Sequence, residues 1–159
     1  MSSILFVCTA NRIRSVYSEY LFRRYLTEYG QDLSHWHVTS AGTWTSDGLP
    51  AMPKAIDAGA ELGLDLTAHR STRIEDVDLS TYDLVVLMEQ GQKEALLFEE
   101  PTLGGRARLL SEMASGIAYD VGDPVGGPRS SYVSTANEID RLISAATPRI
   151  IELVGNQAT

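Results

Sequence analysis

The chain has 159 residues, of which 43% are hydrophobic and 21% charged, and this composition is typical of one globular domain (residues 1–159) rather than of a disordered chain. The formal net charge of −8 argues against broad binding to nucleic acid or to a membrane surface, because both are polyanions. No apolar run is long enough to cross a bilayer and none resembles a signal peptide, so we predict a cytoplasmic protein.

In the first half of the chain, short apolar runs alternate with segments whose apolar residues recur at helical spacing. The predicted elements are a buried strand at Ile4–Cys8, a helix at Ser15–Tyr29 ended by Gly30, a strand at Trp36–Ser40, and a helix at Met52–Leu62 ended by Gly63.

The second half continues the same alternation. It contains a run typical of a central parallel strand at Asp83–Met88, a helix at Gln90–Phe98, a strand at Arg106–Leu110, and a helix at Asn137–Val154. Pro148 is expected to kink or briefly interrupt the last helix.

The alternation of strands and helices predicts an α/β fold of three layers. A central, open and mostly parallel sheet of four strands would carry helices on both faces. Ligands of such sheets bind beyond the carboxyl ends of the strands, which is where Cys8 lies.

The stretch CTANRIRS, Cys8–Ser15, joins the first strand to the first helix. Such a loop directs backbone N–H groups at one point, and the helix N-terminus adds partial positive charge there, so the loop suits a phosphate-sized dianion. Arg14 adds a planar fork for two phosphate oxygens. The loop N–H groups, the helix N-terminus and Arg14 also favour the thiolate form of Cys8, and the Ser15 hydroxyl is placed to donate to the sulfur. A thiolate in an anion cradle is a nucleophile directed at phosphorus; the alternative is a cysteine buried as a small hydrophobic residue.

A nucleophile of this kind needs a proton donor, because a tyrosine leaving group has a pKa of about 10 and departs poorly as an anion. Asp123 lies in the Gly/Pro-rich stretch DVGDPVGGP before the last helix. Loops on a rigid scaffold often carry function, although an Asp-Pro pair by itself is an ordinary turn. The chain has one cysteine and three scattered histidines, at 35, 37 and 69, so we predict no disulfide, no metal and no cofactor.

Taken together, these residues resemble the low-molecular-weight protein tyrosine phosphatase family over essentially the whole chain. The matching segments are the C-x5-R-S phosphate loop at Cys8–Ser15, the second-strand motif TSAGTW at Thr39–Trp44, the segment GLDLTAHRS at Gly63–Ser71 with its histidine, the central strand YDLVVLMEQ, and the acid-bearing loop GDP at Gly122–Pro124.

The resemblance implies roles for these residues. Cys8 would be the nucleophile, Arg14 the phosphate clamp and Asp123 the general acid and base. Asn11 and Ser15 would shape the loop, and His69 would brace Asn11. The remaining substrate contacts implied by the resemblance come from Thr9, Ala10, Arg12, Ile13, Trp44 and Val125.

The implied reaction is hydrolysis of phosphotyrosine through a cysteinyl-phosphate intermediate, without a metal. The implied partners are a phosphotyrosine protein as substrate, a tyrosine kinase that opposes the enzyme, and phosphate or similar oxyanions as ligands. A monomer or weak dimer is expected.

Five positions depart from the family pattern, one of them Val16, which replaces the Pro common after Arg-Ser and is a mild change at a helix start. Ala10 replaces the usual Gly, and its methyl group would strain the loop if the position required a positive φ. Ile13 replaces a second cysteine, so no partner thiol protects Cys8 by a reversible disulfide. Val125 replaces an aromatic wall, and Trp44 is either a wall on the other side or part of the core. Arg12 replaces an apolar residue; we expect it at the pocket rim, attracting acidic or multiply phosphorylated substrates.

Other functions are compatible with the same loop. A thiol-coupled arsenate reductase would hand the arsenic adduct to an external thiol, since the chain has no second cysteine. A monoesterase for sugar phosphates or other small esters is suggested by Val125. A phosphoryl-binding module without turnover is disfavoured, because binding alone requires neither the nucleophile Cys8 nor the acid Asp123.

Overall fold

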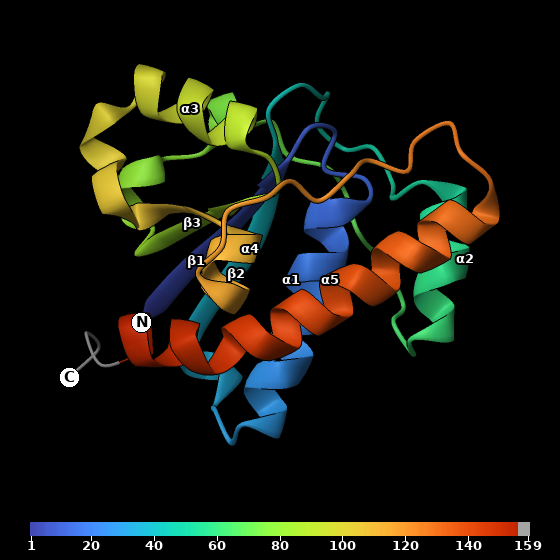
Figure 1. The fold of residues 1–159 in the computed structure, drawn as a ribbon, viewed down its shortest axis with the longest axis horizontal. Coiled ribbons are helices and arrows are strands. Elements are labelled where there is room, and N and C mark those ends of the chain that lie inside the picture. The colour runs from blue at the N-terminus through green and yellow to red at the C-terminus, as the bar shows by residue number, and fades with distance from the viewer. Residues whose placement is uncertain (156–159) are drawn as a thin grey trace.

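Four strands form an open sheet at the centre of the structure, in the order β2-β1-β3-β4 (Figure 1). The computed structural model describes residues 1–155, so the last four residues of the predicted domain, 156–159, lie outside the described residues. The strands are β1 (Ser2–Cys8), β2 (Trp36–Gly42), β3 (Leu84–Leu87) and β4 (Ala107–Leu109). Every pairing is parallel, so the predicted four-stranded sheet is confirmed and is entirely parallel.

Five α-helices and several short turns of helix accompany the sheet. The α-helices are α1 (Arg14–Glu28), α2 (Pro53–Glu61), α3 (Gln90–Glu99), α4 (Leu110–Ser115) and α5 (Arg129–Ile150). The short turns are the 3-10 helices η1 (Leu33–His35), η2 (Ile74–Asp76), η3 (Leu79–Thr81) and η4 (Pro101–Arg106), and the π-helix η5 (Ile151–Gly155). Within residues 1–155, none of these helices combines the length and the apolar character needed to cross a membrane.

The two faces of the sheet carry separate apolar clusters, which confirms the three-layer prediction. Ile4 and Phe6 of β1 pack into a cluster with side chains of α1, α2, α4 and α5. Leu5 and Val7, which point to the opposite face as strand geometry requires, pack with side chains of α3, η2 and η4. Both faces of β1 are therefore buried, and this strand is rigidly held up to its last residue, Cys8.

The strand order positions the loop that follows β1. From β1 the chain crosses to β2 on one side, and it later returns to β3 on the other side of β1. The connections leaving the carboxyl ends of these strands diverge at this point, which is where open α/β sheets bind ligands. The loop beginning at Cys8 lies at this position.

Helix α5 begins at Arg129, eight residues before the predicted start at Asn137. Its first turns, RSSYVST, are rich in Ser and Thr and have low intrinsic helix propensity. They are held by tertiary contacts, because Arg129 forms ion pairs with Asp57 and Glu61 of α2. Contacts between Arg129 and a helix far away in the sequence cannot be predicted from the residues near Arg129.

Pro148 was expected to kink or briefly interrupt the last helix; the interruption is absent, and the kink stays a prediction. Helix α5 continues through Pro148 to Ile150, and only then does the single π-helical turn follow. Pro148 removes one N–H from the helix, but the neighbouring Thr147 and Ile150 are fully buried, so packing on the core maintains the helical path. The short helix α4 was not predicted at all.

Tyr17 links α1 to α2 and provides a test of this packing. Its hydroxyl donates to the Ala55 carbonyl at 3.0 Å, and burial raises the pKa of Tyr17, which keeps the proton in place. We expect Tyr17→Phe to lower the free energy of unfolding by about 1 kcal/mol, measured by urea denaturation. The exposed Tyr29→Phe is the control, and equal stability of the two variants would contradict this account.

Candidate active site

The loop from Cys8 to Arg14 turns on Asn11, the only non-glycine residue with a positive φ in the part of the chain that the structure describes (φ 55°). Asparagine tolerates this left-handed conformation better than most residues. The strain considered for Ala10 does not arise, because that residue has no positive φ. The unusual backbone geometry thus falls on the residue type suited to it.

The Asn11 residue is held in this conformation by four partners. Its Oδ1 accepts the Thr72 backbone N–H at 2.9 Å, and its Nδ2 donates to Ser15 Oγ and Ser40 Oγ, both at 2.8 Å. Its carbonyl oxygen lies 2.7 Å from His69 Nε2. Since the Thr72 contact fixes which way the amide faces, both amide protons must point toward the two serines.

A buried carboxylate fixes the direction of the next hydrogen bond. Ser40 Oγ donates to Glu19 Oε1 at 2.6 Å, and Glu19 pairs with Arg23 at 2.7 Å. A carboxylate only accepts hydrogen bonds, so the single Ser40 proton goes to Glu19. Ser40 therefore accepts from Asn11.

The same reasoning fixes the role of Ser15. Its oxygen accepts a proton from Asn11 Nδ2 and lies 3.0 Å from Cys8 Sγ. The hydroxyl has one proton of its own, and that proton is left for the sulfur. The network therefore directs a hydrogen-bond donor at the Cys8 sulfur.

Gly42, at the end of β2, allows the loop to approach the sheet closely. The backbone N–H groups of Thr43 and Trp44 donate to the carbonyls of Cys8 and Thr9 at 3.0 and 2.9 Å. A Cβ at Gly42 would lie 2.7 Å from the Thr9 oxygen. In the sequence, Gly42 stands out only as part of the TSAGTW motif.

Arg14 is almost fully buried, with 1% of its surface exposed. Its Nη1 donates to the Val121 carbonyl at 2.8 Å and pairs with Glu89 at 3.1 Å. Its Nη2 makes two longer contacts, to Thr9 Oγ1 at 3.4 Å and to Asp123 Oδ2 at 3.3 Å. Inner contacts thus fix the guanidinium, while its Nη2 side remains available for phosphate oxygens.

Glu89 and Gln92 support this arrangement, and sequence reasoning assigned neither a role. They form the capping box of α3, in which Gln92 Nε2 donates to Glu89 Oε2 at 2.9 Å. The same nitrogen donates to Thr9 Oγ1 at 3.0 Å. Their signal in the sequence is a capping-box spacing directly after the β3 strand, whose carboxyl end lies beside that of β1.

Asp123 is carried by the loop before α5. Its Oδ1 accepts the Val125 N–H at 3.1 Å, and the loop is tied to β3 because the Val121 N–H donates to the Met88 carbonyl at 2.9 Å. The Asp123 side chain remains about one-third exposed. These hydrogen bonds therefore orient the Asp123 carboxylate, which remains accessible from the cavity.

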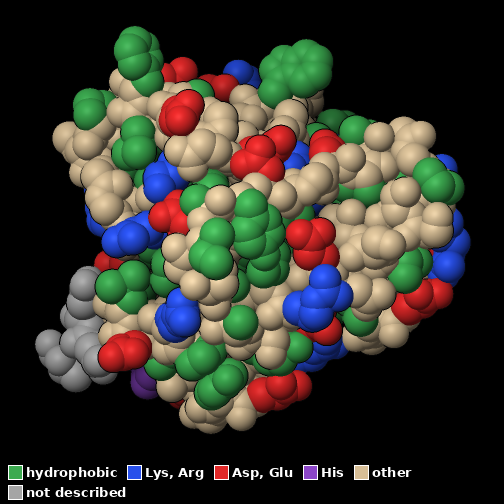
Figure 2. Space-filling model, in the orientation of Figure 1, with side chains coloured by type: hydrophobic (Ala, Val, Ile, Leu, Met, Phe, Trp, Pro, Cys, Tyr) green, Lys and Arg blue, Asp and Glu red, His purple; other side chains and the backbone are tan. Residues whose placement is uncertain are grey.

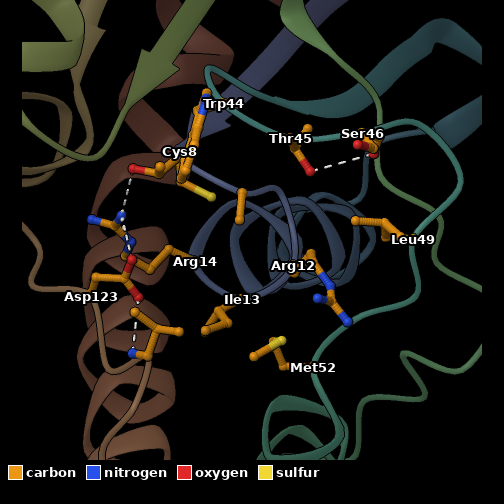
Figure 3. Close-up of a pocket in the computed structure, with 13 residues that line it drawn as sticks. Cys8, Arg12, Ile13, Arg14, Trp44, Thr45, Ser46, Leu49, Met52 and Asp123 are labelled. Carbon is orange, nitrogen blue, oxygen red and sulfur yellow. Dashed lines mark hydrogen bonds and ion pairs between the residues drawn. The ribbon is translucent and has the colours of Figure 1, made fainter.

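These groups surround one cavity with a volume of about 520 Å³ (Figure 3). Its lining comprises Cys8, Thr9, Ala10, Arg12, Ile13, Arg14, Trp44, Thr45, Ser46, Leu49, Met52, Asp123 and Val125. Of the predicted site residues, Asn11, Ser15 and His69 do not line it; they are buried.

The walls of the cavity include Trp44 and several residues that were not predicted from the sequence. Trp44 is 84% exposed, so it stands at the cavity as a wall and is not part of the core. Thr45, Ser46, Leu49 and Met52 were not predicted, because they belong to an irregular segment after β2 that carries no recognisable motif. Sulfur, guanidinium and carboxylate face a largely apolar space, an arrangement suited to cleaving a phosphate ester with an apolar leaving group.

Comparisons with known proteins agree with this geometry. A family model described as "Low molecular weight phosphotyrosine protein phosphatase" matches residues 3–153. The chain is 30% identical to the probable low molecular weight protein-tyrosine-phosphatase EpsP of Ralstonia nicotianae, covering 94% of this chain and 97% of the relative. It is also 30% identical to a protein-arginine-phosphatase of Geobacillus stearothermophilus, covering 92% and 95%.

A solved structure supports the same assignment. The low molecular weight protein tyrosine phosphatase from T. tengcongensis superposes with a TM-score of 0.82 at 34% identity, over 94% of this chain and 99% of that one. The fold is thus shared with an enzyme of this type.

Gly42→Ala tests the close approach between the loop and β2. Because the added methyl group would collide with the Thr9 carbonyl, we expect a loss of about 1–3 kcal/mol in unfolding free energy and weaker binding of inorganic phosphate by calorimetry. Gly91→Ala in α3 is the control, since its Cβ meets nothing within 4 Å and alanine favours a helix. A Gly42 variant as stable as the Gly91 variant would contradict the steric argument.

Ser40→Ala tests the hydrogen-bond chain behind the loop. The change leaves Glu19 Oε1 without its buried donor and removes one of the two acceptors of Asn11 Nδ2, which keeps Ser15, so we expect a loss of about 1–3 kcal/mol in stability and weaker phosphate binding. Ser134→Ala, on the exposed side of α5, is the control. If Ser40→Ala bound phosphate as tightly as the unaltered protein, this series of hydrogen bonds would not shape the loop.

Proposed function

This chain belongs to the low molecular weight phosphotyrosine protein phosphatase family, and we propose that it removes phosphate from phosphotyrosine in proteins. It is a phosphatase, a phosphoric monoester hydrolase, of that family. The observation that carries the proposal is the convergence of Cys8, Arg14 and Asp123 on one cavity with apolar walls. Since relatives of similar identity bear the names of tyrosine and arginine phosphatases, the substrate has to be argued from the cavity.

The first step forms a bond from Cys8 Sγ to phosphorus and breaks the phosphorus–oxygen ester bond. Incoming phosphate oxygens replace Asp123 and Thr9 as partners of Arg14 Nη2, whose contacts to them are long. This exchange frees Asp123 from Arg14, and the carboxylic acid form of Asp123, which the second step regenerates, delivers its proton to the departing phenolic oxygen. Arg14 and the loop N–H groups balance the charge on the equatorial oxygens.

The second step returns the enzyme to its starting state. Asp123 takes a proton from a water molecule, the water oxygen bonds to phosphorus, and the sulfur–phosphorus bond breaks. Inorganic phosphate leaves, and Cys8 is again a thiolate that accepts a hydrogen bond from Ser15. Among the described residues that line the cavity, Asp123 is the only acidic one, so no other carboxyl group there can serve as general acid and base.

The cavity favours phosphotyrosine over phosphoarginine. A phosphotyrosine ring is uncharged and packs well against apolar and aromatic walls such as Trp44, Leu49 and Met52. A phosphoarginine side chain carries a guanidinium, which Arg12 in the same lining repels. The one carboxylate able to attract that cation, Asp123, is paired with Arg14.

The remaining expectations follow from this proposal. We propose a phosphotyrosine protein as the substrate and a tyrosine kinase as the opposing enzyme. A cytoplasmic location and a monomer or weak dimer stay predictions from the sequence.

The test is a substrate panel with two variants. We expect hydrolysis of phosphotyrosine peptides, abolished in Cys8→Ser. Asp123→Asn should lower kcat on phosphotyrosine by about 100-fold or more, and by less on 4-nitrophenyl phosphate, because the more acidic phenol leaves without full protonation. The measurement is steady-state kinetics on matched substrates.

The control is Asp120→Asn, an exposed aspartate of the same loop whose Oδ1 accepts the Gln90 N–H. It should leave kcat unchanged. Faster turnover of phosphoarginine peptides, of a sugar phosphate, or of arsenate with an external thiol would reject tyrosine specificity in favour of that substrate.

A further inference from the structure

Arg12 is the one charged lining residue that takes no part in the chemical steps described above. Its Nε donates to the Pro50 carbonyl at 2.8 Å, which fixes the plane of the guanidinium. Within residues 1–155, its two terminal nitrogens have no hydrogen-bond or ion-pair partner. The side chain is half-buried and lines the cavity. An anchored guanidinium with free N–H groups is therefore presented to the substrate space.

The two cavity arginines lie on different sides. In Figure 3, Arg14 and Asp123 stand on one side, and the Arg12 guanidinium lies across from them with Leu49 and Met52. Arg14 has its charge shared with two carboxylates. Since no acidic residue other than Asp123 lines the cavity, the charge of Arg12 is uncompensated there.

This local charge contrasts with the rest of the molecule. The chain carries a formal net charge of −8, and acidic side chains are spread across the visible face in Figure 2. A distant acidic ligand is repelled by that overall charge, but repulsion between exposed groups is screened beyond about 10 Å. A substrate already seated in the cavity would therefore respond mainly to Arg12.

We propose that Arg12 forms a second anion subsite, which binds an anionic group adjacent to the phosphotyrosine of the same substrate. The ligand chemistry is a carboxylate or a second phosphate, since the planar guanidinium can bind either with two parallel hydrogen bonds. This inference rests on the proposed function, because it takes the aryl phosphate to occupy the Cys8–Arg14 side. It assigns this protein a preference for acidic or doubly phosphorylated sequences.

The test compares peptides that differ in one residue beside phosphotyrosine: Asp, Asn, phosphoserine or Ser. The quantity measured is the ratio of kcat/KM for the charged peptide to that for its neutral partner. We expect this ratio to fall about fivefold in Arg12→Ala, mainly through KM, and to be partly retained in Arg12→Lys. The Asp/Asn and phosphoserine/Ser pairs distinguish a carboxylate from a phosphate as the preferred ligand.

Two controls separate this subsite from the proposed function. Arg141→Ala removes an exposed arginine of α5 and should leave the ratio unchanged. Inhibition by benzylphosphonate, with and without a carboxyl group on the ring, measures the subsite without turnover, and its ratio should also fall in Arg12→Ala. If phosphopeptides are not hydrolysed but the inhibitor ratio falls, the subsite stands and the proposed function fails. Ratios unchanged in Arg12→Ala in both assays would overturn the subsite.

Discussion

The left-handed backbone of Asn11 is the constraint on which the site depends. The positive φ of Asn11 falls in the middle of the loop between Cys8 and Arg14, and a left-handed residue in such a loop is a general way to build a concavity of N–H groups that binds anions. Such a conformation costs free energy and persists only where the surroundings enforce it. Here they do so through Ser15 in the same segment and through three residues that lie 29, 58 and 61 positions away in the sequence, Ser40, His69 and Thr72. The loop is thus held by the whole fold.

The order of the strands in the sheet is the second constraint on the position of the site residues. Parallel order β2-β1-β3-β4 brings the segments after β1, β2 and β3 to one edge, so Cys8, Trp44 and Glu89 come together without any local sequence relationship. Buried Arg14 connects these segments, since it contacts Glu89 after β3 and Val121 in the loop before α5. A charge buried in this way is tolerated only because it is paired and hydrogen-bonded. Its inner contacts hold the guanidinium, and its outer contacts can yield to a substrate.

The sequence predicted the parts whose signals are local. Buried strands, the helix after Cys8 and the spacing from Cys8 to Arg14 are all written in consecutive residues, and the structure has them within one or two residues of the expected bounds. Glu19, Gly42 and Glu89 were missed because their roles are defined by what lies across from them. The start of helix α5 was placed eight residues too late, and an interruption was expected at Pro148, for the same reason: ion pairs of Arg129 support its weak first turns, and core packing carries it past Pro148.

The central claim is that the Cys8 sulfur becomes covalently bonded to phosphorus during turnover. The direct measurement is a rapid quench in denaturant while the enzyme hydrolyses an aryl phosphate, followed by peptide mass spectrometry. The account predicts a phosphoryl group on the peptide that contains Cys8, present at early times, gone when substrate is exhausted, and absent in Cys8→Ser. Turnover without this adduct, or turnover that persists in Cys8→Ser, would contradict it.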